Sequence, residues 1–516
     1  MEETVHAAAG PSAPTASSAG PNAGKGLRPS ALGLLATIVI AVASTAPAYA
    51  LTSALGTVVG AVGTRAPVAI LAAFVPMLLI SYAYKALNSV DPDCGTSFTW
   101  TARAFGRRTG WITGWVIIVA DVVVMANLAY IAGTYTFMLL GLDSLAASTL
   151  WSTVLGGAWI LAMTALSWTG IEISARSQFA MLALEIAVLL VLAVVALVKV
   201  YTHHAGTQAI QPSADWFNPF GPGMTFSAFT GGLIGAVFIY WGWDSAVTVN
   251  EETSNARVTP GRAAVIATLV LVAVFTLVTV AAEAYAGVGS TGIGLGSPTA
   301  SVDALSGLGQ AVLGSWGFKL LILAILSSSA ASAQTTILPT ARTTLAMATY
   351  RALPARMTAI HPRFRTPGVS TWAMGLVSLA FFVAMTYVKN GSLLTDLIAA
   401  TGLQIAFYYG LTGLACAWYF RRATTWRERV LNVLLPLAGG LILLAAGIYS
   451  AHTFWNPAND AGGVTLWGVG GTFVLGVGAM ALGIPLMIAW NLTRAGRSYF
   501  SGGTMDEIDT LLQASS

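Results

Sequence analysis

The stretch Phe238-Ile239-Tyr240-Trp241-Gly242-Trp243-Asp244-Ser245 lies at the centre of an apolar segment that runs from Phe226 to about Asn250. The flanks of the segment are apolar enough to enter a bilayer, whereas its centre contains a glycine, a carboxylate and large aromatic side chains. A carboxylate at bilayer depth is costly unless it has a partner or a function. Glycine lets the backbone leave helical geometry, which is tolerated only where the freed groups face a cavity or a ligand. The stretch therefore predicts a transmembrane helix that is broken near its middle.

A second apolar segment, Ala31 to Val59, is interrupted by Ala43-Ser44-Thr45-Ala46-Pro47. Pro47 has no backbone N–H and cannot continue a regular helix, so this segment is either a second broken helix or a helix with a simple proline kink. Discontinuous helices at mid-membrane are where secondary transporters hold their substrates. Two such helices, each the first of its half of the chain, favour a transporter built from two inverted repeats.

The composition is that of a polytopic membrane protein. Of the 516 residues, 56% are hydrophobic and only 9% are charged, whereas a soluble domain has about 25% charged residues. A helix that crosses the bilayer needs about 20 apolar residues. By this measure the sequence predicts an all-α protein with about 12 transmembrane helices, at residues 31–59, 67–87, 110–141, 148–168, 175–200, 226–250, 262–287, 317–348, 368–388, 393–420, 430–450 and 465–491.

The distribution of basic residues predicts the orientation of these helices. With the N-terminus in the cytoplasm, all but four of the 24 basic residues fall in inner segments; the exceptions are Arg65, Lys199, Lys319 and Lys389. Cytoplasmic loops carry such an excess of Lys and Arg. We therefore expect a multi-pass protein of the plasma membrane, surrounded by lipid, with both termini in the cytoplasm.

The chain is expected to have six parts. Its first residues are rich in Ala, Ser, Pro and Gly and cannot bury enough apolar surface to fold. The last two helices carry no buried charge and are expected to pack on the bundle or to form the contact of a homodimer. The parts are 1–28, a disordered cytoplasmic tail; 29–201, the first inverted repeat with helices 1–5; 202–225, an extracellular loop; 226–421, the second inverted repeat with helices 6–10; 422–492, helices 11 and 12; and 493–516, a cytoplasmic tail.

Four stretches between about residues 30 and 425 resemble the amino acid–polyamine–organocation superfamily, and specifically its bacterial amino acid permeases. The resemblance implies a LeuT-type fold, with a 5+5 inverted repeat and two extra C-terminal helices, and transport by alternating access. The stretches are Gly242-Trp243-Asp244-Ser245 with Glu251-Glu252, Asn255, Arg257 and Pro260; Pro92, Gly95-Thr96, Phe98, Trp100 and Gly106; Leu338-Pro339-Thr340-Ala341-Arg342 with Met347, Leu353-Pro354, His361-Pro362 and Thr366-Pro367; and Gln404-Ile405-Ala406-Phe407-Tyr408-Tyr409-Gly410-Leu411-Thr412-Gly413.

The two breaks are expected to bind the two charged groups of an amino acid. N–H groups freed at the first break favour a carboxylate, which the helix dipole also attracts; carbonyl groups freed at the second break favour an ammonium group. Where the family has a glycine-rich first break, this chain has Ser-Thr-Ala-Pro. The wall of the site is expected to be Phe238 with Trp241, while Trp243 packs in the core. The candidate substrate-binding residues are Ala43, Ser44, Thr45, Ala46, Phe238, Ile239, Tyr240 and Trp241.

The predicted spans contain four acids, Asp121, Glu185, Asp244 and Glu283, whereas Lys and Arg occur only near span ends. Isolated buried charges are neutralised by protonation or by a cation. The acids therefore indicate either proton coupling or a cationic substrate. We expect Asp121 and Glu283 to be structural hydrogen-bonding groups. Glu185 stands where some proton-coupled relatives have a lysine, and it could carry a proton, ligate a cation or hydrogen-bond helix 1.

Three further candidates concern coupling and gating. Asp244 could cap the second half of its helix, since Asp is a good N-cap, or relay a proton. Ser328 and Ser329 match the helix-8 hydroxyls that sodium-coupled relatives use as ligands, although serines also allow close helix packing. A cytoplasmic gate of ion pairs is expected among Glu251, Glu252, Arg257, Arg342 and Arg351.

The sequence thus predicts a secondary active transporter that takes up an amino acid, with a proton as the favoured coupling ion and sodium as the less favoured one. The alternatives are an amine or polyamine carrier and an amino acid exchanger. An enzyme is not expected, because clustered metal ligands and an activated nucleophile are missing from the pattern. The two cysteines and five histidines show no ligand spacing, so we expect no metal and no cofactor, and the charge pattern predicts no nucleic-acid partner.

Overall fold

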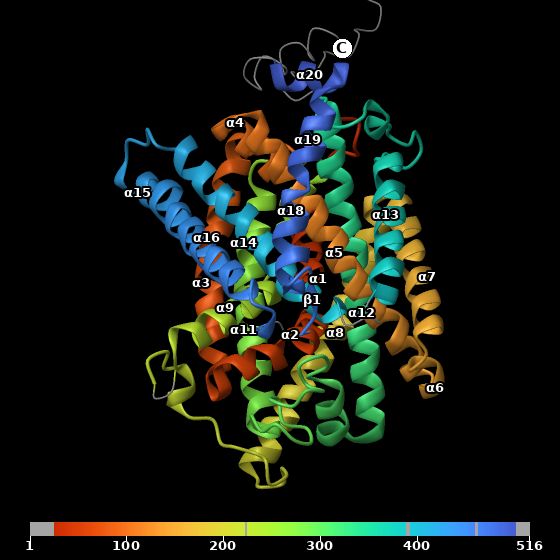
Figure 1. The fold of residues 1–516 in the computed structure, drawn as a ribbon, viewed down its shortest axis with the longest axis vertical. Helices are drawn as coiled ribbons and strands as arrows, with labels where there is room; N and C mark the ends of the chain where they lie inside the picture. Colours follow the sequence, from red (N-terminus) through yellow and green to blue (C-terminus); the bar gives the residue numbers. More distant parts are fainter. Residues whose placement is uncertain (1–24, 222–223, 389–392, 460–462, 502–516) are drawn as a thin grey trace, which may run out of the picture.

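The computed structural model describes residues 25–221, 224–388, 393–459 and 463–501, and Figure 1 shows their arrangement as a bundle of long helices. In this part of the chain ten helical segments are long and apolar enough to cross a membrane, and the apolar helix Phe226–Ile239 is shorter. One of the ten, Leu34–Val90, turns back at Gly63–Arg65 and therefore crosses twice. With the shorter helix, twelve crossings result, as the sequence predicts for an all-α polytopic protein.

The crossings are formed by the following elements, in chain order. The first half contains α1 Leu34–Thr45, α2 Pro47–Val62, η1 Gly63–Arg65, α3 Ala66–Val90, α5 Arg107–Leu139, α7 Thr149–Trp168 and α8 Ile171–Tyr201. The second half contains α9 Phe226–Ile239, α10 Ser245–Thr248, η3 Asn250–Glu252, α11 Thr259–Ala286, α12 Ser306–Thr349, α13 Gly368–Tyr387 and α14 Leu393–Tyr419. The remaining crossings are α15 Trp426–Arg429, π-turn Val430–Leu434 and α16 Leu435–Phe454, then α17 Gly471–Phe473, π-turn Val474–Gly478, α18 Ala479–Ala481 and α19 Gly483–Asn491.

Short elements mark the two ends of the bundle. The helices α4 Ser97–Phe105 and α20 Arg494–Ser501 lie at one end, called the α4 end below, and α6 Asp143–Ala146 lies at the opposite end (Figure 1). The 3-10 turns η2 Ala214–Phe217, η4 Ala355–Thr358 and η7 Pro457–Asn459 lie in connecting segments. At the α4 end the Tyr499 hydroxyl donates to the carbonyl of Arg107 over 3.0 Å, which fixes α20 against the start of α5.

The burial of the helices shows where the centre of the bundle lies. In the most apolar window of α5, 83% of the residues are buried, whereas only 17% are buried in the last crossing, 471–491. The centre is therefore built by α5 and its neighbours, and the last crossing lies at the edge with an exposed apolar face. Such a face suits contact with lipid.

Two of the predicted spans begin at other residues in the structure. The helix α12 begins at Ser306 and bends at Gly314 (φ 71°), so residues 306–316 are helical instead of loop. The Asp303 carboxylate accepts from the N–H of Ser306 over 3.0 Å, and this start signal lies outside the apolar window that defined the span. The predicted span 465–491 opens instead with a hairpin of β1 Thr465–Leu466 and β2 Val469–Gly470; the turn at Trp467 and Gly468 has positive φ, which ends helical geometry.

The end of the predicted N-terminal tail is folded. Residues 1–24 lie outside the described part, but Leu27 is buried and Leu32 pairs with Thr253 as a short parallel bridge. The N–H of Leu32 donates to the carbonyl of Glu252 over 3.0 Å. Lys25 and Leu27, which the sequence analysis placed in the tail, thus already contact the bundle, and their partners lie too far away in the sequence to leave a signal in local composition.

Candidate functional site

The two broken helices meet at Gly242. Its φ of +117° is rare for any other residue, and a Cβ added there would lie 2.7 Å from both the carbonyl carbon and the carbonyl oxygen of Ser44. Between α9 and α10 the chain leaves helical geometry, and between α1 and α2 a single residue, Ala46, adopts left-handed angles (φ 50°, ψ 65°). Glycine at position 242 thus lets one break lie directly against the other.

A carboxylate from α8 occupies the start of α2. Oε1 of the fully buried Glu185 accepts from the N–H of Ala48 over 2.6 Å and from the Ser328 hydroxyl over 2.7 Å. The same hydroxyl accepts from the N–H of Tyr49 over 3.1 Å. Glu185 Oε2 has no hydrogen-bond partner in the described part of the chain. A helix N-terminus is a favourable place for an anion, and here Glu185 supplies it.

The groups predicted to bind a substrate carboxylate are bonded within the protein in this conformation. The N–H of Ala46 donates to the carbonyl of Ala43 over 3.1 Å, and Thr45 bonds Ala41. The carbonyl of Ser44 accepts from the Ser332 hydroxyl over 3.0 Å. Ser329, in contrast, bonds only the carbonyl of Ile325 in its own helix. The helix-8 hydroxyls next to the first break are thus those of Ser328 and Ser332.

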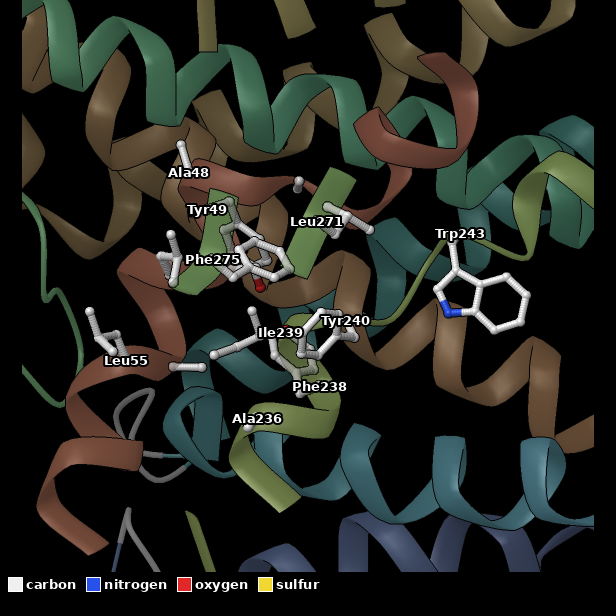
Figure 2. Close-up of a cluster of buried hydrophobic side chains, with 14 of the residues drawn as sticks. Ala48, Tyr49, Leu55, Ala236, Phe238, Ile239, Tyr240, Trp243, Leu271 and Phe275 are labelled. Atoms are coloured by element: carbon white, nitrogen blue, oxygen red, sulfur yellow. The ribbon is translucent and has the colours of Figure 1, made fainter. Parts of the chain in front are cut away.

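At the second break, the carbonyl of Phe238 accepts from the N–H of Trp241 over 3.0 Å. No described backbone N–H outside the helices donates to the carbonyls of Ile239 or Tyr240. The side chains point into packed surroundings. The ring centroids of Phe238 and Tyr49 are 6.4 Å apart, and those of Tyr240 and Phe275 are 5.1 Å apart. Figure 2 shows these rings together and Trp243 set apart from them.

Trp243 lies in the core, as the sequence predicts. It is fully buried and packs at 5.1 Å from the ring of Tyr84 and at 5.2 Å from the ring of Tyr409. Trp241 makes polar contacts instead. Its Nε1 donates to the Tyr408 hydroxyl over 2.5 Å, and that hydroxyl donates to Oδ2 of Asp244 over 3.2 Å.

A small cavity lies against both breaks, and three of the predicted site residues line it: Ser44, Trp241 and Asp244. The other predicted residues do not, among them Ala43, Thr45, Ala46, Phe238, Ile239, Tyr240, Glu185, Ser328 and Ser329. The further residues that line it come from the second break, α10, α5, α12, α14 and the residue before α4, and are Gly242, Ser245, Thr248, Ile117, Asp121, Thr335, Thr336, Pro339, Tyr408 and Thr96.

The acids expected to be structural behave differently from one another. Asp121 accepts a hydrogen bond from the Thr340 hydroxyl and also lines the cavity. Glu283 is buried in α11, does not line the cavity, and has no hydrogen bond to either carboxylate oxygen among the described residues. Asp244 stands at the N-cap position of α10 but makes no capping bond, because its carboxylate is turned toward Tyr408.

Buried and half-buried ion pairs lie at the α4 end of the bundle. Nζ of Lys25 lies 2.8 Å from Asp93 and 2.5 Å from Glu251, and Arg342 pairs with Glu252 in the interior. Of the predicted gate residues, Arg257 instead bonds the last carbonyls of α3, and Arg351 bonds the hydroxyl of Ser498. The ion pairs among the predicted gate residues therefore include Lys25, which the sequence analysis assigned to a disordered tail.

Lys25 and Asp93 both keep their charges at neutral pH. Burial alone would raise the pKa of Asp93, but the ammonium group of Lys25 and hydrogen bonds from Gly95 and Tyr350 outweigh it and lower that pKa to about 2. Burial likewise opposes the charge of Lys25, yet the two carboxylates hold its pKa well above its ordinary value of 10.5. The side chains of Asp93, Cys94 and Glu251 are close enough to hold a metal ion, but the ammonium group of Lys25 already contacts both carboxylates.

The family model described as "Amino acid permease" matches residues 32–479. The matched region contains both breaks, the cavity and most of the gate. The chain belongs to the amino acid permease family. Lys25 lies just before the matched region.

The permease is also similar to individual transporters. It is 25% identical over 478 residues to an uncharacterized transporter of Mycobacterium tuberculosis, covering 92% of this chain and 94% of the relative. It is 26% identical to a methylthioribose transporter of Bacillus subtilis, covering 64% and 69% of the two chains. It is 27% identical to a branched-chain amino acid permease of Bacillus subtilis, covering 58% and 63%. The names differ in substrate, so family membership establishes a transporter and leaves the substrate open.

The sequence of the permease contains a signal for the site residues that were missed on α12, which are Ser332, Thr335 and Pro339. With the predicted Ser328 they are spaced by three or four positions, so all four share one face of a helix. That face contacts Glu185, the first break and the cavity in turn. A polar stripe of this kind on an otherwise apolar helix marks the side that faces the site.

Proposed function

We propose that the permease is a secondary active transporter that takes up an amino acid together with a proton. The observation that carries this proposal is the contact of two broken helices at Gly242 and Ser44, with Glu185 bonded to the start of α2. Backbone groups freed by broken helices serve substrates and coupling ions in transporters of this kind. The substrate would bind where the two breaks meet.

The charged groups of the substrate have separate places in this proposal. The carboxylate would bind at the first break, near Ala43, Ser44, Thr45 and Ala46, once substrate binding has rearranged the bonds that these groups now make with one another. The ammonium group would bind the carbonyls of Ile239 and Tyr240, beside the Phe238 backbone. Trp241 would line the site, since it borders the cavity at the break.

Glu185 is the proposed proton carrier. It is fully buried, it has no basic partner in the described residues, and its Oε2 is free to hold a proton. Protonation would weaken its attraction for the start of α2 and so couple the proton to the break. Sodium is less favoured, because the Ser328 hydroxyl is already bonded to Glu185 and the Ser329 hydroxyl to its own helix.

Transport would proceed by alternating access between two inverted repeats, residues 29–201 and 226–421. We place the α4 end in the cytoplasm of the cell, with both termini there, because the basic residues of the chain gather at that end. The ion pairs of Lys25 and Arg342 would keep that end closed in the conformation of this structure. They would open when the substrate is released inward.

Two alternatives remain. An amine carrier is favoured by the carboxylates of Asp121 and Asp244 in the cavity. An exchanger would share the fold and the breaks but would need no proton. A homodimer through the last two crossings is a further proposal, consistent with their exposed apolar residues.

The test uses the full chain, purified and reconstituted in liposomes, with labelled amino acids and polyamines supplied outside. We expect accumulation of one amino acid under an inward proton gradient and its loss when the gradient is collapsed. Uptake of a polyamine alone would replace the proposal with an amine carrier. Uptake that needs internal substrate and ignores the gradient would make the permease an exchanger.

A further inference from the structure

The cavity beside the breaks is built for a cation. Two carboxylates line it, Asp121 from α5 and Asp244 from the second break, and none of its lining residues in the described chain is basic. Most of its other polar lining is hydroxyl groups. Carboxylates at membrane depth face a partner of opposite charge, a proton or a water-filled path.

Three polar side chains that line this cavity have an oxygen without a hydrogen bond to any described residue. The Asp121 side chain is 5% exposed, and its Oδ2 accepts from Thr340, whereas its Oδ1 has no hydrogen bond in the described part of the chain. The hydroxyls of Ser44 and Thr336 make no hydrogen bond there either. These oxygens are therefore available to accept or donate hydrogen bonds to a group in the cavity. An occupant that donates several hydrogen bonds would satisfy them.

The size of the cavity limits the occupant. Its free volume of about 20 Å³ is room for one water-sized group, which excludes a whole amino acid or a planar guanidinium group. A primary ammonium group has this size, carries three N–H donors and has no acceptor. Ser44 and Gly242 border both the cavity and the meeting point of the breaks, so one substrate can reach both.

We propose that Asp121 and Asp244 bind the terminal ammonium group of the substrate, so that the permease carries a basic amino acid of the lysine type. This inference rests on the proposed function, which places the α-carboxylate and α-ammonium groups at the breaks. The side chain then extends from the breaks into the cavity, where its ammonium group donates to Oδ1 of Asp121 and to the carboxylate of Asp244.

The test is binding of labelled lysine to the purified full-length protein, with displacement by norleucine and by cadaverine. Norleucine has the carbon chain of lysine without the terminal ammonium group, and cadaverine has two ammonium groups without the carboxylate. We expect norleucine to bind about ten- to hundredfold more weakly than lysine, since a hydrogen bond to a charged group contributes about that factor. Asp121→Asn and Asp244→Asn should each weaken lysine binding and leave norleucine binding unchanged. Glu283→Gln, which removes a buried acid outside the cavity, should change neither.

Each variant is first compared with the wild type in elution profile and melting temperature. If Asp121→Asn does not fold, Asp121→Glu replaces it, since its extra methylene would occupy the cavity and should exclude lysine while norleucine still binds. Equal binding of lysine and norleucine by the wild type overturns the inference. So does a preference for lysine over norleucine that stays unchanged in both Asn variants. Uptake of a neutral amino acid in the same preparation would then leave the proposed function standing. Cadaverine binding as tight as that of lysine would support the cavity and overturn the amino acid proposal.

Discussion

Two groups of buried acids in this permease differ in what neutralises them. At the α4 end, Asp93 and Glu251 are paired with Lys25, and Glu252 is paired with Arg342. Near the breaks, Glu185, Asp121 and Asp244 have no basic partner among the described residues and accept only from hydroxyl or backbone groups. The charges of the first group are balanced within the protein. The charges of the second group are not, so these acids can take up a proton or a bound cation.

This difference shows how acids that stabilise the fold can be distinguished by experiment from acids that bind a substrate or a proton. A paired acid should matter for stability and for which end is open, whereas an unpaired acid should matter for what is bound. Removing one partner of a buried pair leaves an uncompensated charge. Removing the charge of an unpaired acid leaves no such charge behind.

The largest effect on stability is expected for Arg342→Ala. Its guanidinium and the Glu252 carboxylate are 1% and 0% exposed, so the variant leaves a buried carboxylate unpaired and should lose about 3–5 kcal/mol of stability. Thermal unfolding of the purified protein would show it. Arg28→Ala is the matched control, because Arg28 pairs with Glu172 at the surface and such pairs contribute about 0–1 kcal/mol. Equal melting temperatures of the two variants would contradict the structural role of the interior pair.

The next effect concerns accumulation. Glu185→Gln keeps an oxygen for the N–H of Ala48 and the Ser328 hydroxyl but cannot release a proton. Stability should change little, exchange should continue, and uptake against a gradient should stop. With a proton gradient of about one pH unit the wild type should accumulate substrate up to about tenfold, since about 1.4 kcal/mol corresponds to a factor of ten.

The control for this change is Glu172→Gln, a half-exposed acid in the first turn of the same helix that pairs with Arg28. It should accumulate substrate like the wild type. Undiminished accumulation by Glu185→Gln in liposomes would show that Glu185 only hydrogen-bonds the start of α2, which is the structural alternative that its contacts also allow.

The two groups also differ in how well the sequence predicted them. The breaks, the number of crossings and the unpaired acids follow from local features: Pro47, Gly242, apolar length, and a carboxylate where none is expected. Lys25 as a gate residue and Ser332 as the partner of Ser44 were missed. Both depend on which helix faces which, over separations of 68 residues or more, and hydropathy does not contain that information.

A smaller effect is expected at the gate itself. Lys25→Gln would leave Asp93 and Glu251 without their ammonium partner and should open the α4 end more often. Cys94 is a natural reporter, because it is buried beside this pair and its thiol contacts the carbonyl of Arg342. Maleimide labelling at fixed pH, located by mass spectrometry, should increase at Cys94. Cys416, buried in α14, should label equally in both proteins, and a parallel rise there would indicate general unfolding instead.

The smallest effect is a predicted absence of pH dependence. The pKa of Asp93, about 2, lies below its ordinary 3.8, so its contribution to stability is present above that value and is lost only as the pH falls toward 2. The pKa of Lys25 lies above its ordinary 10.5, so its contribution is present below that value and is lost only at higher pH. This pair should therefore add no pH dependence to the melting temperature of the wild type from about pH 5 to about pH 8. Melting curves of the wild type in buffers across this range check it, and a steep change within the range would contradict the fixed charges of the pair.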